Sequence, residues 1–89
     1  MDKNTNRANS KEAMYKRLIP NLQAILDERE MSLYQLAHRM KGKPKTNEPR
    51  LSRIMRGKTV PQLESVFAIA NALEVRVERL LGEGYHKNF

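Results

Sequence analysis

Apolar residues recur with the spacing of an α-helix in five separate stretches of the chain. The first core helix is expected to span about residues 19–30, because Pro20 is tolerated only in the first turn of a helix. A short second helix follows at residues 32–40, where Ser32 as N-cap and Gln35 three residues later match a capping box. No stretch alternates with the period of two that is typical of a β-strand. The pattern therefore predicts an all-α fold.

A third helix is expected to begin at Asn47 and to end at Gly57. Asn47 is a suitable N-cap, Pro49 then falls in the first turn, and Gly57 supplies the left-handed residue that commonly ends a helix. The preceding segment, residues 41–50, contains Gly and Pro and is expected to form an extended turn between the second and third helices. The inward side of the third helix is expected to carry Leu51, Ile54 and Met55.

The fourth helix has the clearest amphipathic pattern, and it is expected to open at Val60–Pro61. A turn at residues 74–76 leads to a short fifth helix at residues 77–81. These elements make one domain of residues 18–81, flanked by a polar N-terminal arm at 1–17, partly disordered or a short helix, and a C-terminal tail at 82–89. The inward face of the fourth helix is expected to carry Leu63, Val66, Phe67, Ala70 and Leu73.

The net charge of +7 is concentrated in the middle of the chain. We call residues 39–58 the basic segment, because it is rich in Lys and Arg and its one acidic residue is Glu48. Scattered charge that serves solubility would not gather in this way, so a phosphate-facing surface is favoured over a generic solvated face. The cations of the basic segment are Arg39, Lys41, Lys43, Lys45, Arg50, Arg53, Arg56 and Lys58.

Composition excludes several classes of function. The absence of cysteine excludes disulfides, thiolate metal sites and cysteine nucleophiles. No apolar run approaches the roughly 18 residues that cross a bilayer. His38 and His86 are far apart and have no second ligand at metal spacing, and no paired-carboxylate or Ser–His arrangement is present. We therefore expect a cytoplasmic protein that is not an enzyme, has no metal or other cofactor, and does not bind a membrane.

The order of these elements resembles the phage repressor/Cro-type (XRE-like) family of helix-turn-helix proteins. The resemblance covers residues 18–81 and is most specific in LSRIMRGK at 51–58, followed by P-x-L-E at 61–64. It implies a five-helix, lambda-repressor-like DNA-binding domain whose second and third helices form the helix-turn-helix. It also implies that the partner is double-stranded DNA, with the third helix in the major groove.

Base-reading residues are expected on the outward side of the third helix. Arg50 and Arg53 share a face, and either could give two hydrogen bonds to a guanine, while Glu48 could accept one from a cytosine amino group. By the resemblance, Glu48, Pro49 and Arg53 match positions that touch bases, and we expect Arg53 to be the main reader. The alternative for the two arginines is a solvated surface that is ion-paired to Glu48. Phosphate contacts are expected from Ser32, Lys41, Lys43, Lys45, Ser52, Arg56, Lys58 and Thr59.

These observations favour sequence-specific binding of duplex DNA by a transcriptional regulator of the repressor type. Since one helix reads few base pairs, a homodimer on a two-fold site is expected, joined through the fifth helix with the tail 82–89 or through the N-terminal arm. A second hypothesis is an antitoxin or adaptor that uses the same fold mainly to bind a protein partner, with residues 1–17 folding onto it. A third is nonspecific nucleic-acid binding.

Overall fold

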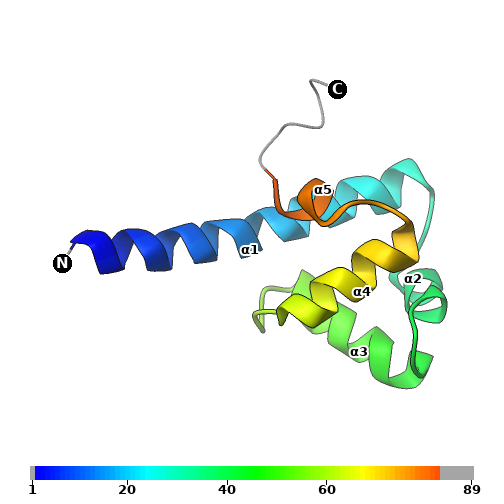
Figure 1. The fold of residues 1–89 in the computed structure, drawn as a ribbon. Helices are drawn as coiled ribbons and strands as arrows, with labels where there is room; N and C mark the ends of the chain where they lie inside the picture. The colour runs from blue at the N-terminus through cyan, green and yellow to red at the C-terminus, as the bar shows by residue number, and fades with distance from the viewer. Residues whose placement is uncertain (1, 83–89) are drawn as a thin grey trace.

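The computed structural model describes residues 2–82 of the chain, and it describes side chains for residues 15–82. This part contains helices and no strand, so the all-α prediction is confirmed (Figure 1). The helices in chain order are α1 (Asp2–Glu28), α2 (Leu33–Arg39), α3 (Pro44–Met55), α4 (Leu63–Leu73) and α5 (Val77–Leu81).

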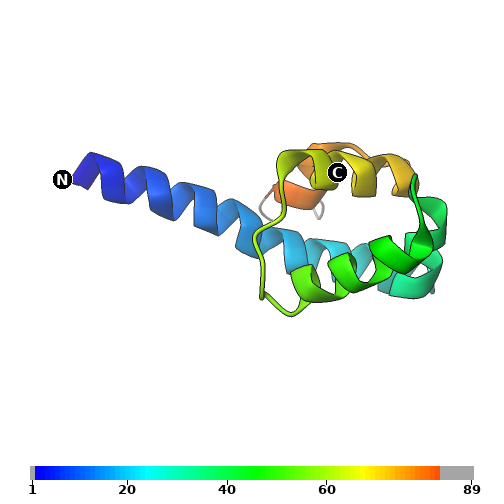
Figure 2. The same ribbon diagram turned by 90° about the horizontal axis from the view of Figure 1, so that it is seen from below.

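The helix α1 is a single element of 27 residues, and its first half projects beyond the other helices (Figures 1 and 2). The expected start near residue 19 is therefore wrong. Pro20 removes the bond that its N–H would donate to the carbonyl of Lys16, a defect that costs about 3 kcal/mol in a helix interior. Both residues are exposed, so water can reach that carbonyl. Leu18 and Leu22 are fully buried on either side, and burial of each contributes about 1.5–3 kcal/mol, which offsets the defect.

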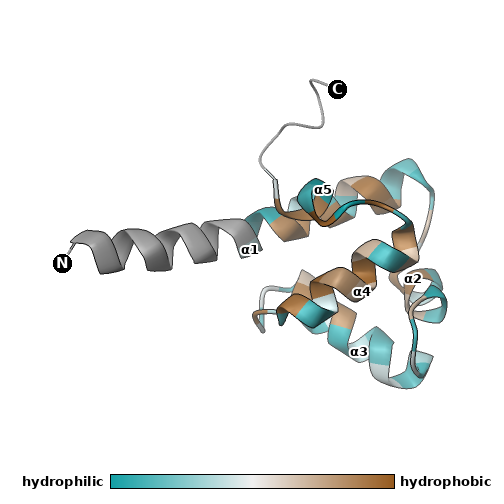
Figure 3. Cartoon of the chain, in the orientation of Figure 1, coloured by the Kyte–Doolittle hydropathy of each residue, from teal (hydrophilic) through white to brown (hydrophobic). Residues whose placement is uncertain are grey.

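One cluster of buried apolar side chains from all five helices and the α2–α3 turn forms the core. In Figure 3 the hydrophobic residues gather where the helices face one another. The expected inward face of α3 is confirmed for Leu51 and Ile54, which are buried, and Met55 is partly buried against them. The buried set is Leu18, Leu22, Ile25, Leu26, Leu36, Ala37, Met40, Leu51, Ile54, Val66, Ile69, Ala70, Leu73 and Leu80.

The helix α4 begins two residues later than expected and buries a narrower face. Pro61 is buried ahead of the helix, and Gln62 is the N-cap. The side chains of Leu63 and Phe67 are 53% and 49% exposed, so their assignment to the inward face is wrong. The reason is that the buried face of α4 consists of Val66, Ile69, Ala70 and Leu73. Leu63 and Phe67 lie at the edge of this face. Glu74, with φ +58°, ends the helix in the left-handed conformation and forms the expected turn.

Side chains of α1 hold the end of α5. Arg17 Nε donates to the carbonyl of Leu81 at 2.9 Å, and Asn21 Nδ2 donates to the carbonyls of Leu80 at 2.7 Å and Gly82 at 2.8 Å. The last carbonyls of a helix have no partner within it, so these bonds satisfy groups that would otherwise need water. The end of α5 is therefore fixed on α1. The predicted tail beyond residue 82 lies outside the described residues.

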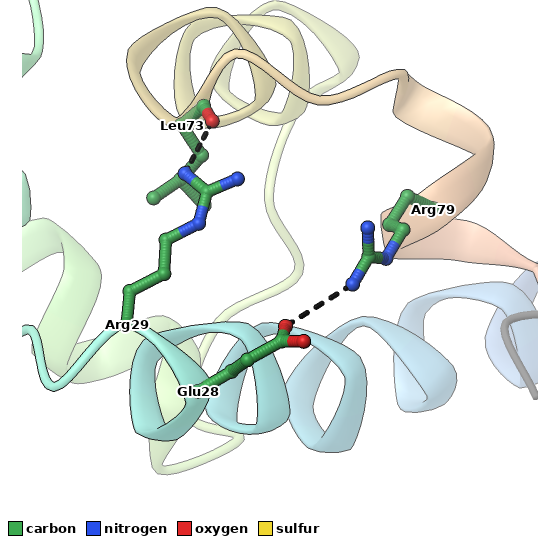
Figure 4. A network of polar contacts seen from close by, with 4 residues as sticks. All are labelled: Glu28, Arg29, Leu73 and Arg79. Atoms are coloured by element: carbon green, nitrogen blue, oxygen red, sulfur yellow. Dashed lines mark hydrogen bonds and ion pairs between the residues drawn. The ribbon is translucent and has the colours of Figure 1, made fainter.

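The C-terminal end of α1 makes a second set of polar contacts (Figure 4). Arg29 donates through Nη1 to the carbonyl of Leu73, the last residue of α4. Glu28 forms an ion pair with Arg79 of α5, with 3.2 Å between Oε1 and Nη2. These contacts tie α4 and α5 to α1 and leave α2 and α3 as the other side of the domain.

Candidate nucleic-acid interface

The start of α2 is set by the capping box that the sequence predicts. The backbone N–H of Gln35 donates to Ser32 Oγ at 3.1 Å, and the backbone N–H of Ser32 donates to Gln35 Oε1 at 2.8 Å. Two backbone donors at the helix start are thereby satisfied by side chains. Ser32 is exposed at this end of α2.

The helix α3 begins at Pro44 rather than at Asn47, so the expected extended turn is wrong. The turn consists of residues 40–43, and Lys43 is the N-cap. A proline suits the first position of a helix because its φ is already helical and its missing N–H would have no partner there. The residues that were expected to lengthen the turn therefore lengthen α3 at its N-terminus. Pro49 lies inside the helix and has no N–H to donate to the carbonyl of Lys45. Both residues are exposed, so water can reach that carbonyl.

Asn47 does not cap α3; it is buried within the helix. Its side chain is 4% exposed, and its Nδ2 donates to the carbonyls of Ala37 at 3.1 Å and Lys41 at 3.2 Å. The expected N-cap role is wrong because Pro44 starts the helix one turn earlier. Asn47 therefore faces α2 and not the helix end.

The exposed side of α3 carries a continuous stripe opposite the core. Lys45, Pro49, Arg53 and Arg56 follow one another at spacings of four, four and three residues, which places them on one face of a helix, and all four are exposed. Toward its N-terminal end α3 is largely hydrophilic (Figure 3). A cationic surface therefore covers the side of α3 that faces away from Leu51 and Ile54.

The C-terminal end of α3 is capped by backbone hydrogen bonds that keep the following loop next to the helix. Gly57 has φ +72°, as expected for the left-handed residue that ends a helix. Its N–H donates to the carbonyl of Ile54 at 2.9 Å, and the N–H of Lys58 donates to that of Arg53 at 3.0 Å. This pair of bonds is the Schellman arrangement. It fixes the backbone of Lys58 beside the last turn of the helix.

An open groove of about 460 Å³ separates α3 from α4. Arg50 and Arg53 enter its lining from α3, Lys41 from the turn and Glu64 from α4. Thr59 lines it from the loop that follows α3. The groove thus brings together two of the expected base-reading residues and two of the expected phosphate contacts.

The cations of the basic segment are exposed and carry no ionic partner among the described side chains. The ion pair found between residues 15 and 82 joins Glu28 to Arg79, far from this segment. The expected alternative, in which Glu48 neutralises Arg50 or Arg53, is not observed. Glu48 and Arg50 lie on opposite flanks of the exposed stripe, since two residues along a helix turn through about 200°. The positive charge is therefore free to meet an anionic partner.

Two helices joined by a four-residue turn, with the second exposing a basic face, are the parts of a helix-turn-helix. A family model described as helix-turn-helix matches residues 22–80, more than half of the chain. The chain belongs to the XRE-like helix-turn-helix family. It is a DNA-binding helix-turn-helix protein with a lambda-repressor-like fold, as the resemblance implied. Searches of curated proteins and of solved structures find no match.

In this helix-turn-helix protein the expected contact residues occupy three neighbouring places. The turn and the start of α3 hold Lys41, Lys43 and Lys45; the body of α3 holds Glu48, Pro49, Arg50, Ser52 and Arg53; and its end holds Arg56, Lys58 and Thr59. Of these, Ser52 is half-buried and the rest are exposed. Ser32 stands apart at the start of α2. Sequence reasoning missed the contact by which buried Asn47 joins α3 to α2, because no local pattern shows that contact.

The remaining candidates for chemistry in this family member make ordinary contacts. His38 Nδ1 lies 3.0 Å from the carbonyl oxygen of Tyr34, and the two rings are 4.2 Å apart. Among the described side chains, no group of three or more His, Asp or Glu could hold a metal ion. Within residues 2–82, no helix combines the length and apolar character needed to cross a bilayer. His86 lies outside the described residues.

Proposed function

We propose that this protein binds double-stranded DNA in a sequence-specific manner and acts in the cytoplasm as a transcriptional regulator of the repressor type. The observation that carries the proposal is the exposed face of α3, whose cations have no ionic partner among the described side chains. A helix of 12 residues is about 18 Å long and fits a major groove about 12 Å wide. The proposal includes no catalytic step, metal or cofactor.

Within this proposal Arg53 is the main reader of bases. It lies on the exposed stripe of α3 and also lines the groove with Arg50, which supports a role for both guanidinium groups as donors of paired hydrogen bonds to guanine. Glu48, exposed on the other flank, would accept from a cytosine amino group. The ring of Pro49, between them on the stripe, offers an apolar contact for a thymine methyl group.

Phosphate contacts surround the base-reading residues at both ends of α3. Lys41, Lys43 and Lys45 lie at its N-terminal end, where the helix dipole also attracts anions. Arg56, Lys58 and Thr59 lie at its C-terminal end, with Ser52 between the two groups and Ser32 on α2. Contacts at both ends would hold the helix in the groove without carrying sequence information.

A homodimer is part of the proposal, because one reading helix covers only a few base pairs and two copies would read a two-fold site. Sedimentation of the free and DNA-bound protein measures the stoichiometry. A monomer in both states would contradict this part alone.

A second candidate function is that of an antitoxin or adaptor that binds a protein partner. The observation that favours it is the projecting first half of α1, which lies outside the matched residues 22–80 (Figure 1). A shortened chain that begins at residue 15 distinguishes the two functions. Under the leading proposal it still binds DNA, whereas partner binding would be lost.

The deciding experiment is selection of bound duplexes from a random DNA pool. We expect enrichment of a short sequence with two-fold symmetry, and the spacing of its halves would report the distance between two α3 helices. Recovery of unenriched DNA, with equal affinity for every duplex, would support nonspecific nucleic-acid binding instead.

A further inference from the structure

Asn47 joins three parts of the helix-turn-helix through one side-chain amide. Its Nδ2 donates to the carbonyl of Ala37 in α2 and to that of Lys41 in the turn, while its backbone belongs to α3. We propose that Asn47 is the positioning residue of this helix-turn-helix: its amide sets the orientation of α3 on α2 and thereby the register in which α3 reads DNA. This inference rests on the proposed function.

The two acceptors of Asn47 make the contact directional. A primary amide has two N–H groups at a fixed angle, and Nδ2 of Asn47 donates to two carbonyls, at 3.1 and 3.2 Å. The carbonyl of Ala37 lies in the last turn of α2, where no residue further along the helix supplies a donor. Because a buried carbonyl without a partner is unfavourable, arrangements of α3 that break this bond are disfavoured.

The other contacts between α2 and α3 do not supply this direction. Leu36 and Ala37 of α2 meet Leu51 and Ile54 of α3 within the apolar core. Apolar burial depends on area and is non-directional, and side-chain packing leaves a scatter of about 15–20° in helix crossing angles, so a directional polar contact can narrow the orientation further. Among the described side chains, Asn47 is the buried polar residue that makes this choice.

The turn is shaped around the amide of Asn47. Gly42 has φ +101°, a conformation that residues with a side chain rarely adopt. A Cβ at Gly42 would stand 3.7 Å from Oδ1 and 3.8 Å from Nδ2 of Asn47. The turn at Gly42 therefore lies close to the amide, and its positive φ, which other residues rarely adopt, keeps the backbone in this place beside Asn47.

A small rotation of α3 is enough to change what it reads. A rotation of about 20° moves a group about 5.5 Å from the helix axis by about 2 Å. That displacement exceeds the spread of hydrogen-bond lengths, so a paired contact from Arg53 to a base would be lost. A lysine near a phosphate would lose little, because attraction between charges has no strict geometry. Loss of the Asn47 contact should thus reduce specificity more than total binding.

The test compares Asn47→Ala and the isosteric Asn47→Asp with the full wild-type chain, on the selected duplex and on a scrambled duplex at one salt concentration. For Asn47→Ala we expect about a tenfold loss of affinity on the selected duplex and less than a twofold loss on the scrambled one. The charge added by Asn47→Asp weakens binding to both duplexes, so for that variant the ratio of the two affinities should fall about fivefold. Gly42→Ala should give the same signature with Asn47 unchanged. Ile25→Val, a core change in α1, is the control for reduced stability and should leave the ratio of the two affinities unchanged.

The outcomes separate the inference from the function on which it rests. If the wild-type chain prefers the selected duplex and both Asn47 variants keep its full preference, the positioning role is wrong and the proposed function stands. If the wild-type chain has no preference, both are overturned. Should Asn47→Ala lose its helical circular dichroism, Asn47→Asp and Gly42→Ala still decide the question.

A direct measurement of orientation does not need DNA. The chain has no cysteine, so spin labels can be placed at His38→Cys on α2 and Thr46→Cys on α3, two exposed positions outside the expected contact set. Dipolar spectroscopy should show a shifted or broader distance distribution when Asn47→Asp is added. An unchanged distribution would overturn the positioning role.

Discussion

Arginine serves two different purposes on the two sides of this domain. On the side of α1, α4 and α5, three guanidinium groups are bound within the protein. Arg17 donates to the end of α5, Arg29 donates to the end of α4, and Arg79 pairs with Glu28. Each of them joins elements that lie far apart in the sequence.

On the side of α3 the arginines have no such partners among the described side chains. Arg50, Arg53 and Arg56 are exposed, and the acidic residue nearest in sequence, Glu48, lies on another flank of the helix. The difference teaches that charge alone does not mark a binding surface. An arginine already bonded to a carbonyl contributes to folding, whereas one held on a rigid helix without a partner is available for a ligand.

The largest effect expected from this comparison concerns Arg53→Ala. Loss of paired hydrogen bonds to a base should cost about 1–3 kcal/mol, or about 5- to 150-fold in affinity, on the selected duplex and little on random DNA. Gel-shift titrations on both duplexes measure it. Arg76→Ala, an exposed arginine just before α5, is the matched control and should change neither affinity. Equal losses on both duplexes would mean that Arg53 touches only phosphate.

The next effect is on stability, and it concerns an arginine that is bonded within the protein, Arg29. Arg29→Ala removes the donor to the carbonyl of Leu73, and a loss of about 1 kcal/mol is expected, since the site is partly solvated. In a domain of this size that lowers the Tm by about 4–8 °C. Thermal unfolding followed by circular dichroism measures it. The affinity of the folded variant for DNA should stay at the wild-type value. A loss of DNA affinity would contradict the division between arginines that serve folding and arginines that serve binding.

A smaller effect is expected at the lysines before and within the first turn of α3. If about five phosphates are neutralised, the logarithm of the affinity should fall against the logarithm of salt with a slope of about −4 to −5. Lys43→Ala and Lys45→Ala should each reduce this slope by about 1 and weaken binding to all duplexes alike. Titrations at several salt concentrations give the slope. Sequence-dependent losses would instead place these lysines against bases.

The smallest effect is expected at the ion pair. The side chains of Glu28 and Arg79 are 65% and 38% exposed, and such pairs contribute between about 0 and 1 kcal/mol. Glu28→Gln should therefore change the free energy of unfolding by less than about 0.5 kcal/mol in a denaturant titration. A larger change would mean that this exposed pair stabilises the packing of α5 on α1 more than such pairs usually do.

Features set by local chemistry could be predicted from the sequence. Ser32 and Gln35 satisfy each other's backbone groups, and Gly57 ends α3, because each signal acts within a few residues. The exposed cations were also predicted, since charged side chains near Leu51 and Ile54 must point away from the core. The all-α fold followed from the same helical spacing.

Features set by distant contacts could not be predicted. Asn47 was predicted to start α3, but the helix starts at Pro44 and the side chain of Asn47 reaches acceptors on Ala37 and Lys41 instead. Pro20 is a local signal for a helix start, but burial of its leucine neighbours overrides it. The groove that joins Arg50 and Arg53 to Lys41 depends on where α4 packs, which no motif in α3 contains.

The bonds of Asn47 also define what could be moved between proteins as a unit. An exchange of helices that takes only residues 44–55 would make the amide depend on the α2 and turn backbone of the recipient for its two carbonyl acceptors. A transplant that begins at Ala37 carries the acceptors and Gly42 along with the helix. The transferable element of this domain therefore starts inside α2 and not at the first residue of α3.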